Sequence, residues 1–281
     1  MSLTGPDEQR VRRPAWPATT GPSAITPPPA ADGEARQISV RGVSKRFGAV
    51  VALRGVDVSI DRHEKVAILG PSGCGKSTLL QIVAGLLDAD VGTVSVAGVT
   101  SAKDRLACCA LMPQRDLLLP WRSALDNASI ALENRGVKRR DARERTRPLF
   151  QRFGLAKFEQ LRPPQLSGGM RQRVSFVRTL MAEKDILLLD EPFGALDSIT
   201  RAEMQEWLRG AMRDVPKTVL LVTHDVEEAL LLADRVVVLC AHPGRVVREL
   251  DSRLEEVGSR REIVTSPEFV KLRELALEAL E

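Results

Sequence analysis

The segment GPSGCGKST, which runs from Gly70 to Thr78, has the residue types and the spacing of a loop that binds phosphate. It fits the pattern G-x-x-x-x-G-K-[ST], follows the apolar run VAIL and precedes the apolar helical pattern STLLQIVAGLL, so a glycine-rich turn without a ligand is a poor alternative. The glycines would let backbone N–H groups turn inward around the β- and γ-phosphates, the lysine would add a point charge, and the serine after it would ligate Mg²⁺. The residues expected to contact a nucleotide are Gly70, Pro71, Ser72, Gly73, Cys74, Gly75, Lys76, Ser77 and Thr78, with Ser77 as the metal ligand.

Two adjacent carboxylates, Asp190 and Glu191, end the apolar run ILLLD and suggest hydrolysis. In a parallel sheet, ligands collect at the carboxyl ends of the strands, so both residues should emerge beside the phosphate loop. Neighbouring residues at a strand end point to opposite sides, which allows two roles. We expect Asp190 to hold Mg²⁺ and Glu191 to orient or deprotonate the attacking water. A surface Asp-Glu turn is the alternative, and the apolar residues ahead of it make that interpretation poor.

Two further side chains follow apolar runs in the same way. Gln114 ends LMPQ, and its amide oxygen can ligate Mg²⁺ or hold the attacking water. His224 ends LLVTH; a single histidine is commonly structural and could cap a helix that begins at Asp225, but its place at a strand end favours contact with the γ-phosphate. The predicted catalytic residues are therefore Lys76, Gln114, Glu191 and His224, and Gln114 and His224 are also expected to contact the nucleotide.

The segment LSGGMRQR has the pattern of a second anion site. Ser167 would cap a helix, and Gly168 and Gly169 would leave the free N–H groups at its positive end unobstructed. Such a cap is weak evidence alone, since many helices begin with Ser-Gly. One chain has no use for two γ-phosphate clamps some distance apart, but two copies packed head to tail could each complete the other's site.

These residues need a sheet that brings the ends of several strands together. Apolar and alternating runs predict strands that are interleaved with helical patterns, which indicates an α/β fold with a largely parallel sheet. Between about 115 and 180 the pattern is only helical, and this predicts an inserted α-helical subdomain. A last helix should begin at Ser266 and Pro267. The expected strands are 38–43, 56–60, 66–69, 91–98, 107–112, 186–190, 218–223 and 235–239.

Composition limits the class of protein and its partners. A net charge of +4, with basic and acidic residues interspersed, argues against a nucleic-acid partner. No apolar run approaches the roughly 18 residues of a membrane span, and the N-terminus lacks a secretory pattern, so we expect a cytoplasmic chain. The four cysteines show no metal spacing and are expected to be reduced. Residues 1–36, rich in proline, are expected to form a disordered tail.

Taken together, the motifs resemble those of the ATPase subunits of ATP-binding cassette (ABC) transporters. The resemblance covers residues 38–250 and rests on GPSGCGKST, the glutamine at 114, LSGGMRQR, ILLLDEP with the following GALD, and the histidine at 224. It implies a P-loop NTPase cassette over residues 37–281, with a mainly parallel core sheet, an antiparallel β subdomain and the inserted helical subdomain at about 115–180.

The same resemblance implies roles for particular residues. ATP would be sandwiched in a homodimer, with Ser167, Gly168 and Gly169 of one copy clamping the γ-phosphate held by Lys76 of the other. The family pattern adds Gln172 to that clamp, gives Asp197 the link between the two sites, and places Phe47 on the adenine ring. Two departures are minor: Met170 replaces a common glutamine, and Gly194 replaces a more usual serine.

A finer resemblance concerns QRDLLLPWRSALDNASIAL, residues 114–132. It is similar to the segment that meets the permease in importers of the nitrate, sulfonate and taurine type, which include importers of thiamine precursors. Leu119, Pro120 and Trp121 would then belong partly to the permease contact, although Leu119 and Trp121 could instead pack within the helical subdomain. The stretch after residue 250 is short for the regulatory barrel of sugar-importer ATPases, and the solute itself is not specified by this chain.

The expected function is therefore ATP hydrolysis that drives solute uptake. The chain would lie on the cytoplasmic face of the inner membrane as a homodimer, bound to permease subunits and served indirectly by a periplasmic solute-binding protein. A soluble ABC ATPase of DNA repair or translation is the first alternative, but such proteins usually carry coiled coils, zinc modules or a second cassette. A P-loop kinase is the second, and it would leave LSGGMRQR and LVTHD without a purpose.

Overall fold

The computed structural model describes residues 36–281, apart from 195, 214–215, 242 and 255–257. The expected proline-rich tail, residues 1–36, lies outside the described residues except for Arg36. The disorder of that tail and the domain boundary at residue 36 therefore stay predictions.

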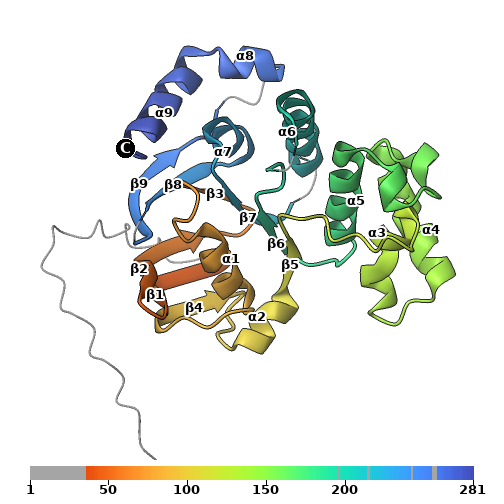
Figure 1. Cartoon of the computed structure of the whole chain (residues 1–281), viewed down its shortest axis with the longest axis horizontal. Coiled ribbons are helices and arrows are strands. Elements are labelled where there is room, and N and C mark those ends of the chain that lie inside the picture. Colours follow the sequence, from red (N-terminus) through yellow and green to blue (C-terminus); the bar gives the residue numbers. More distant parts are fainter. Residues whose placement is uncertain (1–35, 195, 214–215, 242, 255–257) are drawn as a thin grey trace, which may run out of the picture. The chain divides into compact units, whose positions relative to one another are not determined.

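A six-stranded sheet forms the centre of the fold, in the order β5-β6-β7-β3-β8-β9 (Figure 1). The first five of these strands run parallel and β9 pairs antiparallel with β8, which confirms the mainly parallel core. Strands that are covered on both faces read as continuous apolar runs, and this explains ILLL and VVVL. The strands are β3 (Lys65–Leu69), β5 (Cys109–Met112), β6 (Ile186–Asp190), β7 (Thr218–Thr223), β8 (Arg235–Cys240) and β9 (Arg245–Asp251).

The central sheet separates two hydrophobic clusters. Along β3, Ala67 and Leu69 face one cluster, while Val66 and Ile68 face the other, as strand geometry requires. Helix α1 (Lys76–Ala84) packs in the second cluster. The first cluster contains residues of α6 (Ser198–Arg213), α7 (Val226–Leu232) and α9 (Pro267–Glu278), with α8 (Arg260–Val264) beside them. The predicted last helix is confirmed: Ser266 caps α9 by accepting from the Phe269 N–H.

A second, antiparallel sheet has the order β2-β1-β4 and confirms the antiparallel β subdomain. Its strands are β1 (Ile38–Phe47), β2 (Val50–Ile60) and β4 (Val91–Val96). The pattern predicted shorter strands at 38–43 and 56–60. The two strands instead continue to a tight hairpin because Gly48, at φ 57°, supplies the left-handed conformation of the turn.

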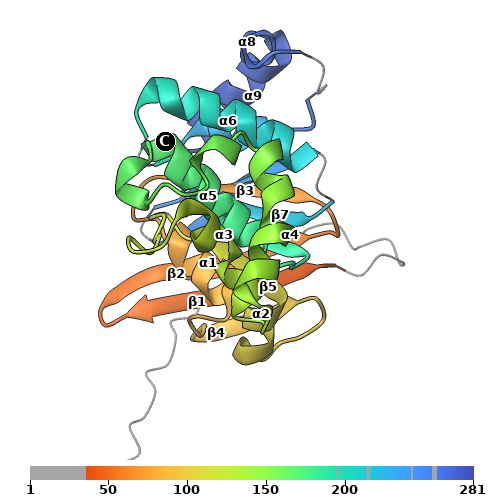
Figure 2. The same cartoon turned by 90° about the vertical axis from the view of Figure 1, so that its right-hand side faces the viewer.

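Residues 115–180 contain helices and no strand, as the pattern predicts. The helices are α3 (Ala124–Glu133), α4 (Arg139–Arg152) and α5 (Gly168–Leu180), and two short 3₁₀ turns, Ala156–Phe158 and Pro163–Gln165, lie between α4 and α5. In Figures 1 and 2 these helices form a group beside the β5 and β6 edge of the central sheet. We refer to this group as the helical region.

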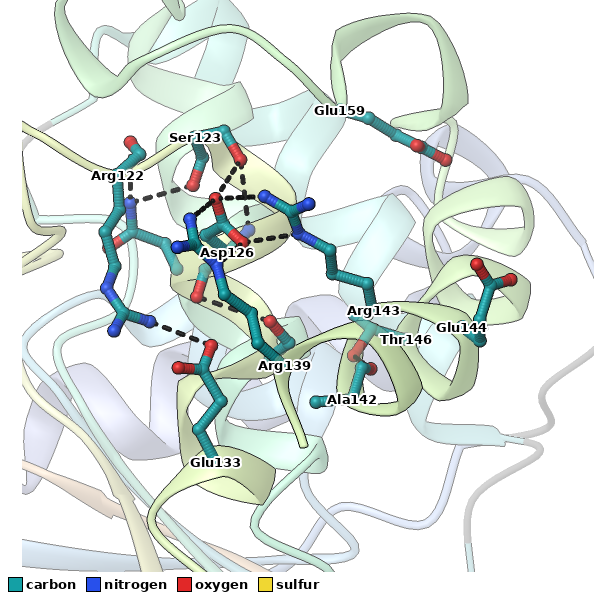
Figure 3. A network of polar contacts seen from close by, with 12 residues as sticks. Arg122, Ser123, Asp126, Glu133, Arg139, Ala142, Arg143, Glu144, Thr146 and Glu159 are labelled. Carbon is teal, nitrogen blue, oxygen red and sulfur yellow. Dashed lines mark hydrogen bonds and ion pairs between the residues drawn. The ribbon is translucent and has the colours of Figure 1, made fainter. Parts of the chain in front are cut away.

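One buried carboxylate organises the helical region (Figure 3). Asp126, on α3, is 2% exposed and accepts two hydrogen bonds each from Arg139 and Arg143 of α4, at 2.6–3.1 Å. Burial by itself would raise the pKa of this carboxyl, but the bonds from the two arginines and from Ser123 outweigh it and hold the pKa well below its usual range. Asp126 therefore stays ionised and fixes α4 against α3.

Two secondary-structure expectations were wrong. Residues 107 and 108 end α2 (Ala102–Cys108) rather than begin a strand, because Ser101 caps a helix by accepting from the Asp104 N–H and the helix continues until the sheet begins. Strand β9 was not expected. Its sequence, RVVRELD, lacks a regular alternation, because Val246 and Val247 are adjacent and the pairing with β8 has a bulge between Val238 and Leu239.

Candidate active site

The phosphate loop lies between β3 and α1, where strand, turn and helix follow one another directly. Its glycines are required by close contacts with neighbouring chain. A Cβ on Gly70 would lie 2.7 Å from the Leu239 carbonyl oxygen. Gly75 has φ 98°, and a Cβ there would lie 2.7 Å from a methyl group of Leu53. The backbone can therefore take this cradle shape only with glycine at both positions.

Lys76 is 4% exposed, and its ammonium group turns back into the loop. Its Nζ donates to the carbonyl oxygens of Gly70 at 2.9 Å and Pro71 at 3.0 Å, and it lies 3.5 Å from Glu191 Oε1. A buried cation held by two carbonyls and one carboxylate is well placed to exchange these partners for phosphate oxygens. The loop thus has the charge and the shape for an anionic nucleotide.

The serine after Lys76 meets the first of the two strand-end carboxylates. Ser77 Oγ donates to Asp190 Oδ1 at 2.9 Å. Burial raises the pKa of Asp190, and the neighbouring Glu191 charge adds to that rise, while the Ser77 bond and Lys76 act against it. A hydroxyl and a carboxylate oxygen side by side are hard oxygen ligands, so this pair fits Mg²⁺.

Glu191 is the point where the other predicted catalytic residues meet. Its Oε2 accepts from Gln114 Nε2 at 3.1 Å and lies 3.2 Å from His224 Nδ1. Its backbone has φ 39°, unusual for a residue with a side chain, and its N–H donates to the Val222 carbonyl of β7 at 2.9 Å. The structure therefore brings Lys76, Gln114, Glu191 and His224 together at the carboxyl ends of the parallel strands.

The two strand-end acids point to different partners, as adjacent residues at a strand end should. Asp190 faces Ser77, and Glu191 faces Gln114 and His224. Gly194 borders the same cluster: a Cβ on it would lie 3.4 Å from Glu191 Oε2. A Cβ at the glycine that departs from the family pattern would thus be in ordinary contact with the Glu191 carboxylate and with Gln114.

The second predicted anion site lies at the start of α5. Ser167 is exposed and caps the helix by accepting from the Met170 N–H at 3.2 Å. The space beside Gly168 is bounded by Leu196, and that beside Gly169 by Thr200, so the neighbours of this helix end belong to the segment after Glu191. The structure does not bring it together with the Lys76 loop within the described residues of one chain.

Comparison with known proteins agrees with this geometry. The family model described as ABC transporter matches residues 53–194. The chain belongs to the ABC transporter family. It is 44% identical to the taurine import ATP-binding protein TauB of Rhizobium johnstonii over 234 residues, which cover 82% of this chain and 89% of that protein. It is 48% identical to the aliphatic sulfonates import ATP-binding protein SsuB 1 of Rhodococcus jostii over 198 residues, 70% of this chain and 77% of that protein.

Solved ABC cassettes have the same fold. A dimeric post-hydrolysis state of the ATP-binding cassette MJ0796, bound to ADP and Pi, matches with a TM-score of 0.67 and 29% identity. The match covers 78% of this chain and 100% of that chain. This chain is thus an ABC transporter ATPase and binds ATP through the cassette described above. Among the residues that the structure describes, no helix is both long and apolar enough to cross a membrane.

The remaining predicted nucleotide contacts of this ABC ATPase differ in exposure. Phe47, at the tip of the β1–β2 hairpin, is 50% exposed, and the Lys45 ammonium lies 5.7 Å from its ring centroid. Half of the Phe47 side chain is thus exposed, and the Lys45 ammonium lies over one face of its ring. Asp197 is exposed, whereas Gln172 is buried and its Oε1 has no hydrogen-bond partner among the described residues. The roles of these three residues stay predictions.

Cys74, inside the phosphate loop, is 1% exposed. Burial raises the pKa of its thiol, so the group is neutral and the residue acts here as a small apolar side chain. Its backbone N–H and carbonyl remain part of the cradle.

Sequence reasoning missed the support beneath His224. Asp225 caps α7 by accepting from the Glu228 N–H at 3.0 Å, and it lies 3.8 Å from Arg201 of α6. Glu228 is 3% exposed, and burial, together with the Asp225 charge, raises its pKa to about 8. The helix cap was visible in THDVEE, but the sequence gives no sign that the second glutamate of the pair turns inward.

Proposed function

We propose that this ABC ATPase is the energy-coupling subunit of an importer for a small sulfonate-type solute, and that it acts as a head-to-tail homodimer. The solute class rests on the names of the TauB and SsuB relatives. The homodimer is supported by the dimeric cassettes of the same fold. On this proposal the chain lies at the cytoplasmic face of the inner membrane against a permease, which receives solute from a periplasmic binding protein.

One observation carries the mechanism: a single chain groups Lys76, Gln114 and His224 around Glu191 and, separately, exposes Ser167 at the N-terminus of α5. Lys76, Glu191 and their partners form the cluster, and Ser167 caps the separate helix end. A helix N-terminus favours an anion. Two chains packed head to tail would place each Ser167 end against the nucleotide of the other chain, so both features gain a function.

In this mechanism the phosphate loop and Lys76 bind the triphosphate, while Ser77 and Asp190 hold Mg²⁺. When bound, Mg²⁺ would neutralise part of the charge on the phosphates. Glu191 orients the attacking water and accepts its proton. Gln114 and His224, which contact the Glu191 carboxylate directly, keep it in the position that this step requires. Lys76 leaves Glu191 when phosphate binds, so the carboxylate becomes available to the water.

The permease contact is proposed at the segment after Gln114. Trp121 is 69% exposed and Leu117 is 58% exposed, and both belong to the stretch similar to the sulfonate-type importers. Such exposure supports the permease contact for Trp121 over packing inside the helical region. Leu119 is half-buried, so it contributes to both.

The homodimer is tested with Glu191→Gln, which keeps the shape of the side chain and removes the base. In Mg-ATP this variant should form a dimer by light scattering, and without nucleotide it should be monomeric. A monomer at every ATP concentration would contradict the shared site. Lys76→Ala in the same background is the matched control, because it removes the phosphate contact and should remain monomeric.

Transport is tested in cells that lack this chain. Uptake of labelled taurine should be restored by the wild-type gene and not by the Lys76→Ala variant. A detergent pull-down from native membranes should recover a multi-pass permease. Recovery of only ribosomes or DNA-repair proteins would support a soluble, non-transport ABC ATPase instead.

A further inference from the structure

The glutamine loop, residues 114–118, connects the catalytic cluster to helix α5 within one chain. At its start, Gln114 donates to Glu191. Two residues later the Asp116 carboxylate accepts from Arg171 Nε of α5 at 3.1 Å through Oδ2, and from the Leu118 N–H at 3.1 Å through Oδ1. The loop thus contacts the active site with one side chain and α5 with another.

A second arginine of α5 holds the backbone of the glutamine loop. The two terminal nitrogens of Arg178 donate to the carbonyl oxygens of Asp116 at 2.6 Å and Leu117 at 2.9 Å. Arg178 is half-buried, and burial lowers the pKa of its guanidinium while the nearby Asp116 charge acts against that effect. Leu117 has φ 45°, a conformation that costs energy for a leucine and that the arginine contacts hold in place.

Arg171 also reaches the start of its own helix. Its NH1 donates to the Leu166 carbonyl at 2.8 Å, directly before the cap residue Ser167. One guanidinium therefore joins Asp116 to the segment that sets the direction of the exposed helix end. Arg178, the other arginine of α5 that contacts the loop among the described residues, lies two turns further along the helix.

We propose that Asp116 is a positioning residue. Through Arg171 it couples the position of Gln114 at Glu191 to the orientation of the Ser167 helix end, which serves the nucleotide of the second copy. The inference rests on the proposed homodimer and adds to it a link between the two half-sites of one chain. Asp116 itself contacts neither nucleotide.

A purely structural role for the ion pair is the competing explanation, and the chain offers a matched control for it. Arg147 and Glu159 also form a pair in the helical region, with the same Nε to carboxylate distance of 3.1 Å. Exposure is similar, at 37% and 19% for Arg147 and Glu159 against 36% and 28% for Arg171 and Asp116. The control pair has no contact with the glutamine loop among the bonds of the described residues.

The experiment uses the full chain with Glu191→Gln as background. Asp116→Asn, Arg171→Met, the double variant and Glu159→Gln are compared by the dissociation constant of the Mg-ATP dimer, measured by light scattering. Binding of a fluorescent ATP analogue at low protein concentration reports the monomer's own site. We expect Asp116→Asn and Arg171→Met each to weaken the dimer about tenfold and the double variant no further. Glu159→Gln should stay within about twofold, and monomer binding should be unchanged in every variant.

The inference fails if Asp116→Asn weakens the dimer no more than Glu159→Gln, or if the two changes at Asp116 and Arg171 simply add. Equal loss of monomer binding would also overturn it, since the effect would then lie in the chain's own site. If Asp116→Asn does not fold, Arg171→Lys tests the same ion pair between Asp116 and Arg171. A background variant that remains monomeric would instead refute the proposed homodimer, and this inference with it.

Discussion

Glu228 should make the stability of this ATPase depend on pH in a way that one substitution removes. The residue follows His224 by four positions and is 3% exposed, and its Oε1 has no hydrogen-bond partner among the described residues. Burial is the main cause that raises its pKa from 4.5 to about 8, and the nearby Asp225 charge adds to it. At neutral pH the folded protein therefore keeps this carboxyl protonated, whereas the unfolded chain ionises it.

The sign follows from the two pKa values. Because the folded pKa exceeds the unfolded one, the stabilising effect of the bound proton is complete below about pH 4.5, declines as pH rises, and is lost above about pH 8. A pKa difference of 1 corresponds to about 1.36 kcal/mol. The displacement of the Glu228 pKa from 4.5 to about 8 thus corresponds to about 5 kcal/mol across this range.

Glu228→Gln imitates the protonated side chain and cannot ionise. Its melting temperature should equal that of the wild type near pH 5 and exceed it at pH 9 by on the order of 10 °C, since about 1 kcal/mol shifts a protein of this size by about 2–4 °C. Thermal unfolding of both proteins without nucleotide, from pH 5 to pH 9, measures the difference. Glu268→Gln, at an exposed position of α9, controls for the loss of a carboxylate in general. If the melting temperatures of Glu228→Gln and wild type differ by the same amount at every pH, the buried Glu228 carboxyl is not neutral.

Three further results are expected. Lys76→Ala should reduce ATP hydrolysis by about 100-fold or more in a phosphate-release assay, because the buried cation in the phosphate loop is lost. Gly194→Ala should fold and keep ATPase activity within about threefold, since its Cβ would be in ordinary contact with Glu191 at 3.4 Å. Gly75→Ala should instead lower the melting temperature and abolish ATP binding, because a Cβ there would clash with Leu53 at 2.7 Å. Asp126→Asn should lower the free energy of unfolding by about 3 kcal/mol at pH 7, measured by urea unfolding. The difference from wild type should shrink as pH falls below 3.8, because a carboxyl with a lowered pKa stabilises the fold only while it is ionised.

The sequence predicts that the side chains around Glu191 meet, because they share one simple position, although their catalytic roles stay predictions. Lys76, Asp190 and His224 each follow an apolar run, and parallel strands bring such ends to one edge of a sheet. Local pattern and topology then suffice, since no knowledge of which helix faces which is needed. The helix caps at Ser167 and Ser266 are equally local and are found for the same reason.

The contacts that the sequence does not reveal are those that depend on packing between distant elements. Asp116 and Arg171 lie 55 positions apart, and nothing in either motif indicates their pairing. Glu227 and Glu228 look alike in the sequence, yet the first binds Arg260 at the surface and the second is buried, because only the rotation of α7 against α6 decides which faces inward. Strand β9 was missed for a related reason, since the bulge in its pairing with β8 removes the regular alternation that marks a strand.

In the proposed mechanism Glu191 has two functions that nucleotide binding must separate. Its carboxylate contacts Gln114 and His224 through one oxygen and faces Lys76 with the other. The group that we propose as the proton acceptor therefore also compensates the buried charge of Lys76. When phosphate takes over that compensation, the Lys76 contact is released, while the Gln114 and His224 contacts can persist on the other oxygen. On the proposed mechanism, binding of ATP thus frees one side of the Glu191 carboxylate, and only in the chain that holds the nucleotide.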